Sequence, residues 1–88
     1  MLRITKESEG MSVVTLRLEG QIMSTWVQVV ECEIGRLLQS EKKVVLDFTE
    51  VKVIDSKGAN MLKRVIRRDV RIINCPTFIQ EFLFNGQK

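Results

Sequence analysis

The segment from Val44 to Phe48 constrains the fold most, because it is apolar at every position except Asp47. A short run of this kind is typical of a buried parallel strand. Stretches with apolar residues at spacings of three and four lie on either side of it, one from Trp26 to Leu38 and one from Ala59 to Ile66. These spacings predict two helices, so the order indicates strand–helix–strand units in a parallel sheet.

The N-terminal part of the chain is expected to add an antiparallel edge to this sheet. Leu2 to Thr5 and Val13 to Leu18 are predicted strands, and the short polar turn between them suits a hairpin. Gly20 is expected to stop the second strand. Ser24 or Thr25 is expected to cap the following helix, because a hydroxyl there accepts a hydrogen bond from a free backbone N–H.

The C-terminal part is expected to add one parallel strand, Val70 to Ile73, and a last helix that begins at Cys75-Pro76-Thr77. The buried face of that helix is predicted to carry Phe78, Ile79, Phe82 and Leu83, with Gly86 at its end. The sequence therefore predicts a small mixed α/β fold, with a mostly parallel sheet and helices mainly on one face.

At 88 residues, the chain fits a single domain that spans residues 1–88. A domain of this size buries a limited core, so a second copy in a homodimer is a further expectation, with Phe84 as a candidate contact. No apolar run approaches the length of about 20 residues that a membrane span needs, and the N-terminus does not resemble a signal peptide. Membrane insertion is therefore not expected, and the cytoplasm is the expected location.

The composition argues against catalysis. Histidine is absent, which excludes Ser-His-Asp triads, Cys-His pairs and His-ligated zinc. Cys32 and Cys75 are too few for an all-cysteine zinc site and are expected to be small buried hydrophobic residues. Neither common phosphate-loop motif is present. We therefore expect no enzyme activity, no metal and no cofactor.

The junction from Ile54 to Gly58 carries the main functional hypothesis. It follows the carboxyl end of the central predicted strand, where ligands and partners usually meet α/β sheets. A phosphate on Ser56 would meet the free N–H groups of a helix N-terminus, with Lys57 beside it and Asp55 opposing it. The alternative interpretation is that Asp55 or Ser56 only caps the helix.

Two segments of the chain resemble the STAS domain family, which includes anti-sigma factor antagonists. These are Leu46-Asp47-Phe48 with its spacer to Ile54-Asp55-Ser56-Lys57-Gly58, and Leu16 to Ile22, similar to the family's strand ending in Gly-x-Leu/Ile. The resemblance implies a binding module. In the antagonist branch, a kinase that is itself the anti-sigma factor phosphorylates the serine that Ser56 matches. The implied partner-binding residues are Asp55, Ser56, Lys57, Gly58, Met23 and Ser24.

Several positions depart from the family pattern. Lys57 replaces a Ser or Thr, Met23 replaces an Asp near the switch, and Ala59-Asn60 replace Leu-Gly. A further strand and helix often follow in the family, and they do not follow Asn85 here. The sequence thus resembles a short, divergent, stand-alone member, in which a second copy could supply the absent elements.

A basic stretch from Lys57 to Arg71 supports two alternatives. Its candidate surface is Lys63, Arg64, Arg67 and Arg68, with Asp69 as the one acid in the stretch. A STAS subunit without a switch could use it to dock on a transporter ATPase or another signalling complex. A small nucleic-acid or lipid binder is the weaker alternative, since the stretch has no aromatic residue to stack on bases. A solvated helix face is the plain interpretation, and we expect no nucleic-acid partner.

Overall fold

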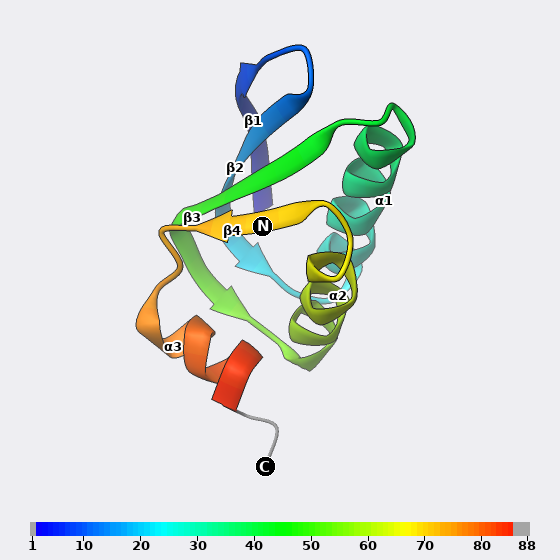
Figure 1. Ribbon diagram of the computed structural model, residues 1–88. Coiled ribbons are helices and arrows are strands. Elements are labelled where there is room, and N and C mark those ends of the chain that lie inside the picture. The colour runs from blue at the N-terminus through cyan, green and yellow to red at the C-terminus, as the bar shows by residue number, and fades with distance from the viewer. Residues whose placement is uncertain (1, 86–88) are drawn as a thin grey trace.

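The computed structural model describes residues 2–85 and shows a four-stranded sheet in the order β1-β2-β3-β4 (Figure 1). The strands are β1 (Leu2–Glu9), β2 (Val13–Ile22), β3 (Lys43–Ile54) and β4 (Val70–Ile73). The helices are α1 (Thr25–Gln39), α2 (Ser56–Ile66) and α3 (Thr77–Gln80), and a π-helical turn, η1 (Glu81–Asn85), extends the last one. Only β1 runs antiparallel to its neighbour, so the predicted mixed and mostly parallel sheet is confirmed.

One face of the sheet builds the core, and helices α1 and α2 cover it (Figure 1). Alternate residues of the two central strands are buried there: Val14, Leu16 and Leu18 from β2, and Val44, Leu46 and Phe48 from β3. Ile79 of α3 and Leu83 of η1 join the same core. The prediction of helices mainly on one face is therefore confirmed.

The opposite face of the sheet, called the open face below, is mostly polar and partly exposed. The residues paired across it are Thr15, Arg17, Val45, Asp47, Arg71 and Ile73. The strict alternation along β2 explains this, since successive side chains of a strand point to opposite faces. Trp26 is half-buried and packs against the core rather than inside it.

The prediction that Gly20 stops β2 is wrong. The strand continues to Ile22, and its pairing with β3 shifts register on both sides of Gly20, between Arg17 and Glu19 and between Gly20 and Gln21. Gly20 has φ 111, which a residue with a Cβ rarely adopts. The glycine therefore permits an irregularity inside the strand instead of ending it.

Two other expectations about burial are wrong. Phe78 is 50% exposed and Phe82 is 39% exposed, because the short helix α3 and the turn η1 present only Ile79 and Leu83 to the core. Cys32 is exposed on α1, while Cys75 is half-buried. The side chain of Phe84 and the whole of Gly86 lie outside the described residues, so their predictions stay predictions.

Gly58 allows α2 to begin directly against the ends of β2 and β3. A Cβ on Gly58 would lie 2.6 Å from the carbonyl oxygen of Ile22 and 2.8 Å from Cγ1 of Ile54. By contrast, a Cβ on Gly35 in α1 would meet nothing within 4 Å. The first position excludes a side chain, and the second does not.

This contrast gives a matched pair of variants. Gly58→Ala should lower the free energy of unfolding by about 1–3 kcal/mol, because backbone atoms must move to admit the methyl group. Gly35→Ala should raise the free energy of unfolding by about 0.5–1 kcal/mol. Position 35 lies in a helix interior, and alanine has less conformational freedom than glycine to lose when the chain folds. Urea unfolding followed by circular dichroism measures both. Equal effects of the two variants would contradict the close approach at Gly58.

Candidate functional site

The carboxylate of Asp55 connects the starts of the two main helices. Asp55 is the N-cap of α2, and its Oδ1 accepts a hydrogen bond from the backbone N–H of Gly58 at 2.8 Å. Its Oδ2 accepts a second from the backbone N–H of Ser24 at 3.0 Å, 31 residues earlier in the chain. The backbone N–H of Asp55 also donates to the carbonyl of Ile22. One residue therefore fixes the end of β2 through its backbone, and the approach to α1 and the first turn of α2 through its side chain.

Ser24 occupies the N-cap position of α1 but does not act as predicted there. Its side chain makes no capping hydrogen bond, and its backbone has φ 53, in the left-handed region. A non-glycine residue is uncommon in that region and needs support from its surroundings. The bond from its N–H to Asp55 supplies that support, so Ser24 is held by α2 instead of capping α1 with its hydroxyl.

Asp55 is negatively charged at neutral pH. The N–H of Ser24, and next the N–H of Gly58, hold the pKa of its carboxyl below the usual value, because both bonds favour the ionised form. The positive end of the α2 dipole acts in the same direction. The candidate site is therefore built on an ionised Asp55 carboxylate, and both of its oxygens already accept backbone hydrogen bonds.

Ser56 is the first residue of α2, and its side chain is exposed. Asp55 performs the capping, and no side-chain hydrogen bond of Ser56 occurs within residues 2–85. The capping alternative therefore applies to Asp55 and leaves the Ser56 hydroxyl free. Lys57 is exposed beside it, whereas Gly58 is buried and contributes by its fit rather than by contact with a partner.

A groove of about 460 Å³ between α1 and α2 leads away from Ser56. Its lining includes Ser24, Lys57 and Arg64. Arg64 of α2 forms an ion pair across it with Glu31 of α1, with Nη2 3.0 Å from Oε1. Met23 is half-buried, and its carbonyl accepts the N–H of Trp26 at the start of α1. The predicted partner-binding residues thus gather where the two helices begin.

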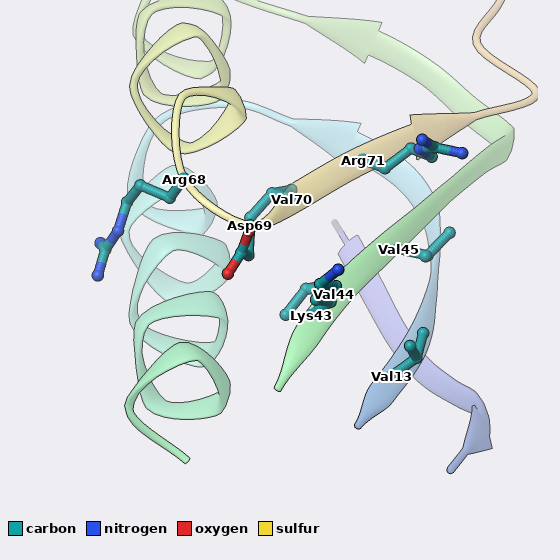
Figure 2. Close-up of a pocket in the computed structure, with 8 residues that line it drawn as sticks. All are labelled: Val13, Lys43, Val44, Val45, Arg68, Asp69, Val70 and Arg71. Atoms are coloured by element: carbon teal, nitrogen blue, oxygen red, sulfur yellow. The ribbon is translucent and has the colours of Figure 1, made fainter. Parts of the chain in front are cut away.

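The four residues of the predicted basic surface do not form one continuous unpaired patch. Lys63, Arg64 and Arg67 share a shallow hollow on α2, but Arg64 is paired with Glu31. Arg68 instead lines a separate pocket of about 370 Å³ at the amino ends of the strands (Figure 2). Figure 2 also shows the side chains of Arg68 and Arg71 pointing in opposite directions, so these two arginines do not form one cluster.

Sequence reasoning assigned no role to Asp47, which is only 9% exposed on the open face. Its Oδ1 accepts the side-chain hydroxyl of Thr49 at 2.6 Å, the Thr49 N–H at 3.0 Å and Asn74 Nδ2 at 3.2 Å. These bonds, with Thr49 first, lower the pKa of the carboxyl. Asn74 has φ 55 at the turn after β4, so Asp47 fixes that turn. The signal in the sequence was a lone acid in an apolar strand.

Two classes of site find no support in the described part of the chain. Residues 2–85 contain no group of three or more potential metal ligands. None of the described helices is both long and apolar enough to cross a membrane.

These features define a small α/β domain in which an exposed serine begins a helix capped by the preceding aspartate. The family model of the STAS domain matches residues 4–73, and the chain belongs to this family. The fold is similar to that of the anti-sigma factor antagonist SpoIIAA in its unphosphorylated form, with a TM-score of 0.76 and 16% identity over 94% of this chain and 82% of that one.

A second solved structure, Mglu, has a TM-score of 0.65 and 23% identity. The match covers 85% of this chain but only 19% of that one, so the similarity concerns one part of a much longer protein. No curated protein sequence matches this chain. The resemblance to the STAS family and the STAS-like fold expected from the sequence are both confirmed.

The role of the Asp55 carboxylate can be tested by Asp55→Asn, which keeps the shape but leaves one oxygen where two N–H groups need acceptors. The free energy of unfolding at pH 7 should fall by about 1.5–3 kcal/mol, as expected for a hydrogen bond to a charged group. Urea unfolding of wild type and variant between pH 3 and 8 measures the difference.

The pH dependence of that difference follows from the lowered pKa of Asp55. A carboxyl whose pKa is lower in the folded state contributes stability above its unfolded pKa of about 3.9 and loses it as pH falls through the folded value. The gap between wild type and variant should therefore be constant from pH 8 to 5 and shrink below pH 4. A gap that persists unchanged into acid would contradict the role of the charge.

Proposed function

We propose that this STAS domain is a protein-interaction module that binds a kinase-type anti-sigma factor through the surface around Ser56. The observation that carries the proposal is the free, exposed Ser56 hydroxyl on a helix that Asp55 already caps. A serine needed as a cap would have its hydroxyl engaged with the backbone. Here the hydroxyl is available to a partner and to a modifying enzyme.

Phosphorylation of Ser56 by that kinase would regulate the interaction. The γ-phosphoryl group of ATP would pass to the Ser56 oxygen, the hydroxyl proton would be released to a base of the kinase, and ADP would leave. The product adds a charge of about −1.5 to −2 at neutral pH, next to the anion of Asp55. Lys57 and the N–H groups of the first turn of α2 that Asp55 does not engage would hold the phosphate in place. Its charge would repel an acidic partner surface and would be costly to bury against an apolar one.

The role we propose is binding and not catalysis. The titratable side chains of the site are Asp55 and Lys57, and both oxygens of Asp55 accept backbone hydrogen bonds. An engaged carboxylate with a lowered pKa is a poor general base. The SpoIIAA-like fold agrees with this proposal, since that protein is an antagonist of an anti-sigma factor.

A second candidate function is a STAS subunit that docks on a transporter ATPase or another signalling complex without a phosphorylation switch. The observation in its favour is the groove between α1 and α2, where the exposed Lys57 offers positive charge beside Ser24. Lys57 and Met23 occupy positions at which the antagonist pattern has other residues. In this case charge on α2, rather than the state of Ser56, would control binding.

Capture from native cell lysate, followed by mass spectrometry, separates the two functions. Tagged wild type, Ser56→Ala and Ser56→Asp are compared with Thr77→Asp, which adds the same charge to the exposed first residue of α3. We expect wild type, Ser56→Ala and Thr77→Asp to retain a kinase-like ATPase. Ser56→Asp should retain at least about tenfold less, corresponding to about 1.4 kcal/mol of binding free energy.

Two results would contradict the switch. Retention of the same partner by Ser56→Asp at the wild-type level would show that charge at this position does not matter. Equal loss in Ser56→Asp and Thr77→Asp would show a general effect of added charge. Loss of the partner from Arg67→Glu with full retention by Ser56→Asp would favour the second candidate function.

A further inference from the structure

The strand β4 ends the sheet, and one of its sides has no partner among the described elements (Figure 1). Val44 of β3 lies opposite Val70, and its N–H donates to the carbonyl of Asp69 at 2.9 Å. In a parallel pair the backbone groups that face the neighbour alternate along the strand. Arg71 and Ile73 therefore direct their N–H groups to β3, and Val70 and Ile72 direct theirs outward.

The outward backbone groups remain available. Among residues 2–85, no backbone hydrogen bond of a turn, loop or cap involves Val70 or Ile72. The protections that proteins use on exposed edges include a short strand, charged side chains, a proline, a bulge and a covering segment. The part of β4 that pairs with β3 has regular register and contains no proline. Its protections are its shortness and the charge of Arg71, and an acidic segment would neutralise that charge.

A groove of about 410 Å³ runs beside this edge, between the end of α2 and the start of α3. Its apolar lining comes from Ile66, Val70, Ile72 and Cys75. The Cys75 thiol adds to this character, because burial raises its pKa and keeps it uncharged. A strand added beside β4 would therefore place every second side chain in an apolar slot on the helix side of the sheet.

The other side of such a strand would meet positive charge. Arg71 lies on the open face, and Arg67 and Arg68 precede the strand. All three are exposed, and none forms an ion pair with another described side chain. Asp69 is the one acid between them. A second copy of the chain would bring its own unpaired arginines to the same seam, which disfavours pairing of β4 with itself.

We propose that β4 binds an extended acidic segment of a partner protein, which adds to the sheet as a fifth strand. Backbone hydrogen bonds to Val70 and Ile72 supply the register, as in other cases of strand addition. Apolar side chains of the segment fill the groove, and Asp or Glu side chains at alternate positions face Arg71 on the open face. The β4 edge follows the C-terminal end of α2, whereas Ser56 lies at the N-terminal end of that helix. The proposed binding edge is therefore separate from the Ser56 site.

Synthetic peptides test the proposal by nuclear magnetic resonance on the full chain. The probe is acetyl-Glu-Val-Glu-Val-Glu-Val-amide, and the composition control is acetyl-Glu-Glu-Glu-Val-Val-Val-amide. The third peptide is the probe with methylated backbone nitrogens on its strand-facing side. Before peptide is added, the amides of Val70 and Ile72 should exchange with solvent faster than those of Arg71 and Ile73.

The alternating peptide should slow exchange of the Val70 and Ile72 amides. The methylated peptide should bind at least about tenfold more weakly, as expected for the loss of one or two hydrogen bonds. The block-ordered peptide should also bind more weakly, because it cannot place its valines in the groove and its glutamates on the open face at the same time. Arg71→Glu should reverse the preference, toward acetyl-Lys-Val-Lys-Val-Lys-Val-amide. Ser56→Asp should bind the probe as wild type does, which separates this surface from the proposed switch.

Four outcomes would overturn the proposal. The first is that Val70 and Ile72 are already protected in the free protein. The second is that the alternating and block-ordered peptides bind equally, which would indicate plain charge attraction. The third is the absence of binding at millimolar peptide. The fourth is that a DNA oligonucleotide binds the arginines more tightly than the probe while both amides stay in fast exchange, which would assign the surface to nucleic acid.

Discussion

The two hydrogen bonds accepted by the Asp55 carboxylate are the interaction on which the site depends. One reaches the first turn of α2 and the other reaches Ser24, before α1. Together they hold the two helices at the carboxyl ends of β2 and β3, where Gly58 lies too close to the carbonyl of Ile22 for a side chain. The bond from Gly58 also caps α2, so the Ser56 hydroxyl is not needed for capping.

The fold separates two surfaces along a single helix. Ser56 begins α2 at the carboxyl ends of the central strands, and the unpaired arginines lie where that helix ends and β4 begins. Asp47 has a similar organising role on the open face, because it holds the turn at Asn74 that follows β4. Engaged carboxylates thus fix the backbone at two places, Asp55 at the starts of the two helices and Asp47 at the turn after β4.

Much of the fold follows from local patterns, and much of the site does not. Apolar spacing predicts the order of the elements, and the continuous run from Val44 to Phe48 predicts the buried parallel strand. The hydrogen bond from Ser24 to Asp55 joins residues that are 31 apart in the sequence. Local sequence patterns therefore do not predict that the Ser24 side chain leaves α1 uncapped. The irregular pairing around Gly20 and the exposure of Phe78 likewise depend on contacts with residues that are distant in the sequence. The lone acid at Asp47 was visible, but its partners were not.

Scalar couplings across hydrogen bonds, measured in isotope-labelled protein at neutral pH, test the role of Asp55 most directly. We expect couplings from the side-chain carboxyl carbon of Asp55 to two backbone nitrogens, those of Ser24 and Gly58. We also expect the Ser56 hydroxyl to exchange freely with water. Absence of the coupling to Ser24, or a Ser56 hydroxyl protected by a bond to the backbone, would contradict the claim that Asp55 holds both helix starts and leaves Ser56 free.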